Sequence, residues 1–245
     1  GEINTLKGNK NWMMAHEPRM HHSNFGSKIN DLKPIIDQNA SDSAALDSTI
    51  ELLVQSKRSL PMAKILTIPE PWAHRRDFPK KLKDLYAYAG AVMEPWDGPA
   101  AICGAHNEWV IAGMDRNGLR PLRYTLTKDY LIAGSETGMV EIDENNILEK
   151  GRVGPGQMIA VNFKENKFYK DKDIKKYLSE TKPFGSWTKK ITHIDKLVES
   201  AEEEFRDLDS SLLRKRMASF AWTIEDLELI LDPMIKEKKE ATGSM

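Results

Sequence analysis

Cys103 is the side chain of this sequence best suited to covalent chemistry, because a thiolate is a strong nucleophile. It is the single cysteine among 245 residues. It lies in the apolar run 100–105, and a free cysteine in such a run is typical of a small buried hydrophobe. The sequence therefore predicts a buried structural thiol. One cysteine also excludes an internal disulfide and a multi-cysteine metal site, which fits a reducing cytoplasm.

Three histidines lie close together in the sequence and could suggest a metal site. They are His16, His21 and His22. Structural metal sites combine such residues with further cysteine or acidic ligands at regular spacing, and this loop-rich stretch offers none. We expect histidines that are solvated or hydrogen-bonded, and no metal site.

The stretch 115–121, Asp-Arg-Asn-Gly-Leu-Arg-Pro, has two interpretations. Arg120 could reach a substrate carboxylate from a hairpin. Asn-Gly pairs, however, commonly build tight turns because both residues tolerate positive φ, so a scaffold role is favoured.

Charge and composition limit the class of partner. The chain has 36 basic and 37 acidic residues, a formal charge of −1, and 40% hydrophobic residues. The two signs are interspersed, so we expect no nucleic-acid or lipid binding, and no stretch approaches a membrane span. A small-molecule or protein partner is favoured.

Residues 1–40 are expected to be loop-rich, and helices are expected to follow between residues 41 and 90. A short helix is expected near Leu6–Met14, and Ser41-Asp42-Ser43 is an N-terminal signal for a helix that runs to about Arg58, with Leu46, Ile50 and Leu53 on one face. The run 60–68 could be helix or strand. Asp77 and Pro79 open a further helix that ends near Gly90.

From Pro99 to Tyr169 short apolar runs alternate with turn residues, which predicts antiparallel strands. The expected strands are 100–105, 109–115, 122–127, 130–135 and 158–163. Beyond about Lys182 the chain reads as helical. Its two apolar stripes are Leu197, Ala201, Phe205 and Leu208, then Leu227, Ile230, Leu231 and Met234.

Five segments carry a resemblance in order: 1–9 (GEINTLKGN), 41–47 (SDSAALD), 58–61 (RSLP), 93–100 (MEPWDGPA) and 115–121 (DRNGLRP). They resemble the glutaminase domain of glutamate synthase large subunits, a class II glutamine amidotransferase. The resemblance implies an α+β fold, part of the four-layer αββα sandwich of N-terminal nucleophile hydrolases with antiparallel sheets, followed by a mainly helical segment. It places the C-terminal part of the amidotransferase domain at 1–187, and a linker with the start of the central domain at 188–245.

The resemblance also implies that the chain is a fragment. The family's nucleophile is a processed N-terminal cysteine whose own α-amino group is the base, and no residue here matches it. No histidine at a family position would activate Cys103. We therefore expect this chain alone to be inactive.

Gly1, Asp42 and Glu136 match family positions around the glutamine, and Arg120 of the 115–121 motif is a further candidate. Gly1 matches the glycine of the oxyanion hole, where the lack of a Cβ lets an N–H approach the developing charge; a plain turn glycine is the alternative. Asp42 matches the carboxylate that binds the α-ammonium, and a helix N-cap is its alternative. Glu136 and Arg120 are weaker candidates for substrate binding.

The function implied is glutamine hydrolysis, with the ammonia added reductively to 2-oxoglutarate by the full enzyme. FMN and an iron–sulfur cluster are implied for that enzyme, with no cofactor in this segment. Partners would be the remaining domains of the large subunit and an electron-donor subunit or ferredoxin; the donor stays open. Another class II amidotransferase and a non-catalytic interaction domain are the alternatives.

Overall fold

The computed structural model describes residues 2–192, 194–198 and 209–238, so Gly1 and most of the predicted stripe from Leu197 to Leu208 lie outside the described residues. The chain divides into two compact units, residues 1–191 and 192–245. Each unit is described by itself.

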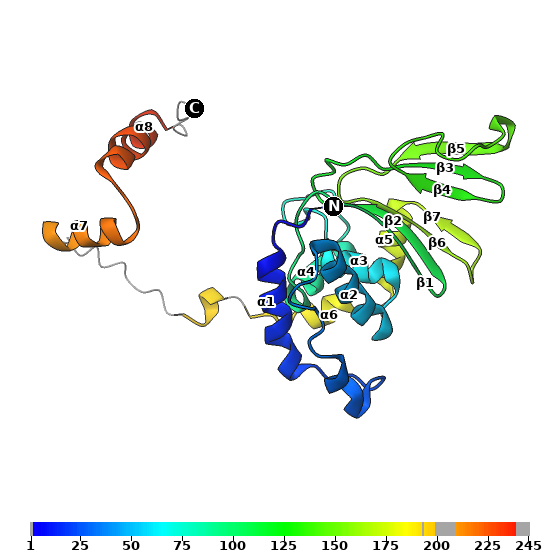
Figure 1. The fold of residues 1–245 in the computed structure, drawn as a ribbon, viewed down its shortest axis with the longest axis horizontal. Helices are drawn as coiled ribbons and strands as arrows, with labels where there is room; N and C mark the ends of the chain where they lie inside the picture. The colour runs from blue at the N-terminus through cyan, green and yellow to red at the C-terminus, as the bar shows by residue number, and fades with distance from the viewer. Residues whose placement is uncertain (1, 193, 199–208, 239–245) are drawn as a thin grey trace. The chain divides into compact units, whose positions relative to one another are not determined.

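Helices make up the first half of the larger unit (Figure 1). They are α1 (Leu6–His16), the short 3₁₀ turns η1 (Glu17–Arg19) and η2 (Gly26–Leu32), α2 (Asp42–Gln55), α3 (Leu60–Thr67) and α4 (Lys80–Val92). Two further helices, α5 (Asp171–Glu180) and α6 (Phe184–Thr188), follow the strands. The expected helices are confirmed within a few residues. The ambiguous run 60–68 is a helix, because Pro61 suits a first turn and all eight residues of α3 are buried.

The strands form two antiparallel sheets. The first has the order β1-β2-β6-β7, with β1 (Ala101–His106), β2 (Trp109–Met114), β6 (Met158–Asn162) and β7 (Lys167–Tyr169). The second has the order β4-β3-β5, with β4 (Leu131–Gly134), β3 (Arg123–Thr127) and β5 (Ile147–Arg152). The prediction of antiparallel strands between Pro99 and Tyr169 is confirmed.

Two strands, β5 and β7, are absent from the prediction, because β5 holds few apolar residues and β7 is only three residues long. β5 alternates half-buried and exposed positions and is fixed by its pairing with β3. Its Gly151 lies under the Tyr124 ring, where a Cβ would come within 2.3 Å of Cζ. A strand of this kind is determined by its neighbour more than by its own pattern.

The core has layers that match the expected α+β sandwich. The α3–α6 helices pack on one face of the first sheet through a large apolar cluster that includes Leu60, Leu85, Ile111 and Met158. The opposite face meets the second sheet, where Ala112 and Ile159 share a cluster with Tyr124 and other residues. The order is therefore helices, sheet, sheet, as Figure 1 shows.

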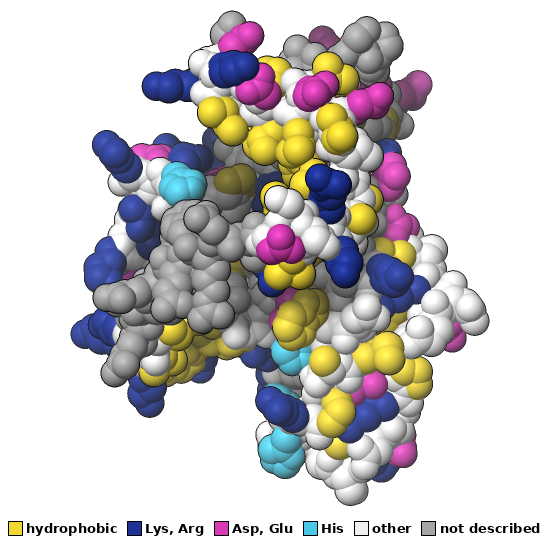
Figure 2. All heavy atoms as spheres, turned by 90° about the vertical axis from the view of Figure 1, so that its left-hand side faces the viewer, with side chains coloured by type: hydrophobic (Ala, Val, Ile, Leu, Met, Phe, Trp, Pro, Cys, Tyr) yellow, Lys and Arg dark blue, Asp and Glu magenta, His cyan; other side chains and the backbone are white. Residues whose placement is uncertain are grey.

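The smaller unit is helical where it is described. It contains η4 (Ile194–Lys196), α7 (Ser210–Ser219), a π-helical turn η5 (Asp226–Leu231) and α8 (Asp232–Glu237). Large apolar side chains such as Phe220, Ile224 and Ile235 are exposed. In the upper part of Figure 2, hydrophobic side chains lie among charged ones on the surface. Among the residues that the structure describes, no helix is long and apolar enough to cross a membrane.

Candidate functional site

Asp42 lies at the start of α2 and holds two backbone groups with its two carboxylate oxygens. Oδ2 accepts from the N–H of Ile3 at 2.8 Å, and Oδ1 accepts from the N–H of Ser43 at 2.7 Å. These donors, Ile3 first, lower the pKa of Asp42 below its ordinary value. The cap of the helix is Ser41, whose Oγ accepts from Ala44 N at 3.3 Å. Asp42 is therefore an anion whose oxygens each keep a second lone pair for a ligand.

A cavity of about 460 Å³ opens beside Asp42. One wall is the first two turns of α2, another is Ile3, and the third is the beginning of β1. Its lining is Ile3, Asp42, Ser43, Ala44, Leu46, Asp47, Ile50, Ala100, Ala101, Ile102 and Cys103. A small amino acid with an aliphatic chain suits this mixture of an anion and apolar walls.

The prediction of a buried Cys103 is wrong. The residue is exposed on β1 and lines the same cavity as Asp42. The strand is at the edge of its sheet, so alternate side chains of the apolar run lie open instead of being covered. Partial burial of the thiol still raises its pKa, which keeps it protonated at neutral pH.

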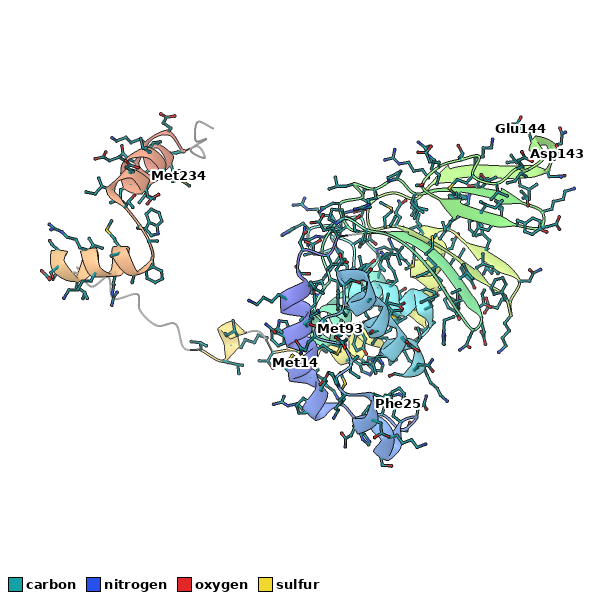
Figure 3. All side chains as sticks on the ribbon, viewed as in Figure 1. Met14, Phe25, Met93, Asp143, Glu144 and Met234 are labelled. Atoms are coloured by element: carbon teal, nitrogen blue, oxygen red, sulfur yellow. The ribbon has the colours of Figure 1, made fainter. Side chains whose placement is uncertain are left out.

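The other site candidates do not gather at Asp42. Arg120 lies in another cavity, formed by residues 118–123 with Arg152 and Val153, and its Nε donates to the carbonyl of Pro99 at 3.2 Å. Glu136 lines a small cleft on the second sheet with the 137–142 loop. That connection continues to a tip where Asp143 and Glu144 point away from the helices (Figure 3). The assignment of Gly1 falls outside the described residues.

The three histidines do not converge on a common point suited to a metal. His16 Nε2 lies 3.1 Å from an oxygen of Glu94, and His22 Nδ1 accepts from the N–H of Asn24. Among the residues that the structure describes, no group of three or more His, Cys, Asp or Glu side chains is arranged to hold a metal ion.

Residues 97–99, Asp-Gly-Pro, lie beside the site, and sequence reasoning gave them no role. The carbonyl of Pro99 accepts a hydrogen bond from Glu2 N, and the carbonyl of Asp97 accepts one from Asn4 N. Gly98 has a φ of +148°, a conformation that L residues rarely adopt. A glycine between Asp and Pro was the available signal, since such a position suits strained backbone.

Three features point to one class of protein. They are the carboxylate held against residues 2–4, the cavity sized for an amino acid and the paired antiparallel sheets under helices. The family model for class-II glutamine amidotransferases matches residues 1–187, so the chain belongs to this family.

Curated relatives of the chain include several glutamate synthases. The chain is 50% identical over 248 residues to the glutamate synthase [NADPH] large chain of Azospirillum brasilense, covering 100% of this chain and 16% of the relative. It is 39% identical to that of Bacillus subtilis, with the same coverage. A glutamate synthase [NADH] of Schizosaccharomyces pombe is 42% identical over 255 residues and is covered to 12%. The chain therefore spans about a sixth or less of these relatives.

Proposed function

We propose that this chain is part of a glutamate synthase large chain and contributes the ammonium-binding half of its glutaminase site. The observation that carries the proposal is identity of 50% extending over the whole chain. The geometry around Asp42 supports it, because a half-buried carboxylate faces a cavity large enough for one glutamine.

In this proposal the α-ammonium of glutamine binds Asp42. Its oxygens already accept from Ile3 and Ser43, and those bonds fix the direction of the remaining lone pairs. A charge-assisted hydrogen bond of this kind contributes about 1.5–3 kcal/mol. The aliphatic part of glutamine would lie along Leu46 and Ile50 of α2, which line the same cavity.

The amide end of glutamine would lie toward Gly1, whose N–H stabilises the negative charge that develops on the amide oxygen. A family-type N-terminal cysteine would attack the amide carbon and release ammonia, and water would then cleave the thioester to give glutamate. Cys103 is the single cysteine in the 245 residues, and its protonated thiol does not fit the role of this nucleophile.

The whole enzyme would add the ammonia to 2-oxoglutarate and reduce the product to glutamate in the cytoplasm, drawing electrons from a pyridine nucleotide or ferredoxin. FMN and an iron–sulfur cluster would serve that reduction. An iron–sulfur cluster is held by several cysteine thiolates, and these 245 residues contain one cysteine. The cluster's ligands would therefore come from other domains of the large subunit.

Asp42→Asn in the full-length protein tests this function. The variant keeps the shape but loses the charge that pairs with the ammonium, so we expect glutamine KM to rise about tenfold or more, in line with a lost bond of about 1.5–3 kcal/mol. The measurement is glutamate formation from 2-oxoglutarate with either glutamine or ammonia as nitrogen donor.

Ammonia bypasses the pocket, so ammonia-dependent glutamate formation should stay at the wild-type level. Asp47→Asn, also on the cavity wall, serves as the matched control. It should change glutamine KM little, because Asp47 is exposed and does not match the family's ammonium-binding carboxylate. Equal loss of both activities in Asp42→Asn would identify Asp42 as a structural residue. A wild-type protein without glutamine-dependent activity would disprove the proposed function itself.

A further inference from the structure

Residues 2–4 are held by three successive backbone N–H groups. Glu2 N donates to the carbonyl of Pro99 at 2.9 Å, and Asn4 N donates to the carbonyl of Asp97 at 2.7 Å. Between them, Ile3 N donates to Asp42 at 2.8 Å. The segment therefore lies between Asp42 on one side and residues 97–99 on the other, which we call the 97–99 clamp.

Gly98 is the point of closest approach in this clamp. A Cβ built on Gly98 would lie 1.9 Å from the carbonyl oxygen of Glu2 and 2.8 Å from both Asn4 N and the Cα of Ile3. All of these are backbone atoms, which cannot rotate away as the end of a side chain can. A side chain at position 98 therefore requires residues 2–4 to move, in addition to the strain of a φ of +148°.

The clamp is itself anchored on both sides. Asp97 N donates to Thr5 Oγ1 at 3.0 Å, which ties the clamp to the residue after the held segment. On the far side, Arg116 pairs with Asp97 Oδ2 at 2.5 Å, and Arg120 Nε donates to the carbonyl of Pro99 at 3.2 Å. The hairpin of residues 115–121 thus holds the clamp, which is a use for Arg120 other than substrate binding.

We propose that Gly98 and the 97–99 clamp are positioning elements of the glutaminase site. This inference rests on the proposed function. Gly1 is joined to Glu2 by a planar peptide bond, so the clamp that holds Glu2 limits where the Cα of Gly1, the residue that carries the candidate oxyanion donor, can lie. The same segment presents Ile3 N to Asp42, so one backbone couples the two ends of the glutamine pocket.

The test is Gly98→Ala in the full-length protein. Loss of a well-placed oxyanion donor reduces turnover by about 10²–10³-fold, so we expect glutamine-dependent kcat to fall by about 100-fold. Ammonia-dependent glutamate formation should be unchanged. Hydrogen exchange of the amides of residues 2–5 should become faster, because the three hydrogen bonds are weakened.

Gly26→Ala is the matched control, since Gly26 also has a positive φ of +51° but a Cβ there meets nothing within 4 Å. It carries backbone strain without the collision and should leave kcat and the exchange of residues 2–5 at wild-type values. If Gly98→Ala does not accumulate, Thr5→Val replaces it. This change removes the acceptor of Asp97 N and also the bond from Thr5 Oγ1 to Asn9 Oδ1, so it should lower glutamine-dependent kcat about tenfold, and Thr5→Ser, which keeps the hydroxyl, should restore it.

Unchanged exchange of residues 2–5 in Gly98→Ala would overturn the clamp, whatever the activity. Faster exchange with unchanged glutamine-dependent kcat would overturn its role in positioning. Parallel loss of glutamine-dependent and ammonia-dependent activity would assign Gly98 to folding alone. The exchange measurement needs no activity, so it distinguishes failure of the clamp from failure of the proposed function.

Discussion

At the level of single residues, the candidate pocket is lined by two ionisable groups, Asp42 and Cys103, that differ in protonation state. Asp42 has a lowered pKa because backbone N–H groups stabilise its charge, whereas Cys103 has a raised pKa because its thiol is partly buried. At neutral pH the first is an anion and the second is a neutral thiol. The carboxylate anion suits the recognition of an ammonium group, and the neutral thiol does not suit nucleophilic attack.

Cys103→Ser in the full-length protein should therefore leave glutamine-dependent kcat within about twofold of wild type, because a neutral thiol without a base contributes no nucleophile. Glutamine KM should change by a similarly small factor, since Cys103 lines the cavity without holding a charge. Steady-state kinetics with glutamine and with ammonia measure both values. A thousandfold loss of glutamine turnover, with ammonia turnover intact, would mean that Cys103 attacks the substrate.

At the scale of elements, a buried network of charges joins α3, α5 and the turn before β6. The ammonium groups of Lys64 and Lys175 both donate to the carbonyl of Gly156 at 3.4 Å. Lys175 also pairs with Glu70 at 2.5 Å and with Asp171 at 2.7 Å. Among the residues that the structure describes, no carboxylate lies within salt-bridge distance of Lys64. Its burial, followed by the charge of Lys175, lowers its pKa from 10.5 to about 8.

Replacing this buried lysine should stabilise the helical layer at neutral pH. Lys64→Met removes a buried ammonium group whose pKa has fallen from 10.5 to about 8. At roughly 1.4 kcal/mol per pH unit, the gain in stability is at most on the order of 3–4 kcal/mol. Lys175 still donates to Gly156 in the variant. The measurement is the opening free energy of α3 amides by native-state hydrogen exchange in the full-length protein.

The gain should depend on pH in a defined direction. Between pH 8 and 10.5 the unfolded chain binds more protons at Lys64 than the folded chain, so the stability of the wild-type layer rises with pH there. The advantage of methionine should be largest below pH 8 and should shrink toward pH 10.5. Lys172→Met, at an exposed position of α5, should show no such trend. A constant advantage of Lys64→Met over this range would mean that Lys64 titrates normally.

At the scale of the whole molecule, the described layers end with an open edge strand, β1, beside the candidate pocket. A polypeptide of these 245 residues alone should hydrolyse glutamine no faster than buffer, because it offers no activated nucleophile and binding groups alone leave little catalysis. Ammonia release with glutamine, compared with a no-protein control, measures this. Release above that control would show that another residue of the chain acts as nucleophile.

Most of the regular elements could be predicted from local sequence patterns. Apolar stripes such as Leu46, Ile50 and Leu53 require a buried helical face, and turn residues such as Asn107, with a φ of +47°, require reversal of the chain. These signals are local, since they depend on neighbours within a few residues. The amidotransferase family also followed from the order of short motifs, and the comparison with the family confirmed it.

Only the tertiary structure decided what surrounds each of these residues. Cys103 has the local pattern of a buried residue but lies open because β1 is an edge strand. Gly98 looks like an ordinary turn glycine until the backbone of Glu2 is seen 96 positions earlier in the sequence, within 1.9 Å of the Cβ that it lacks. Exposure and close approach depend on contacts between distant segments, and a one-dimensional pattern carries no record of those contacts.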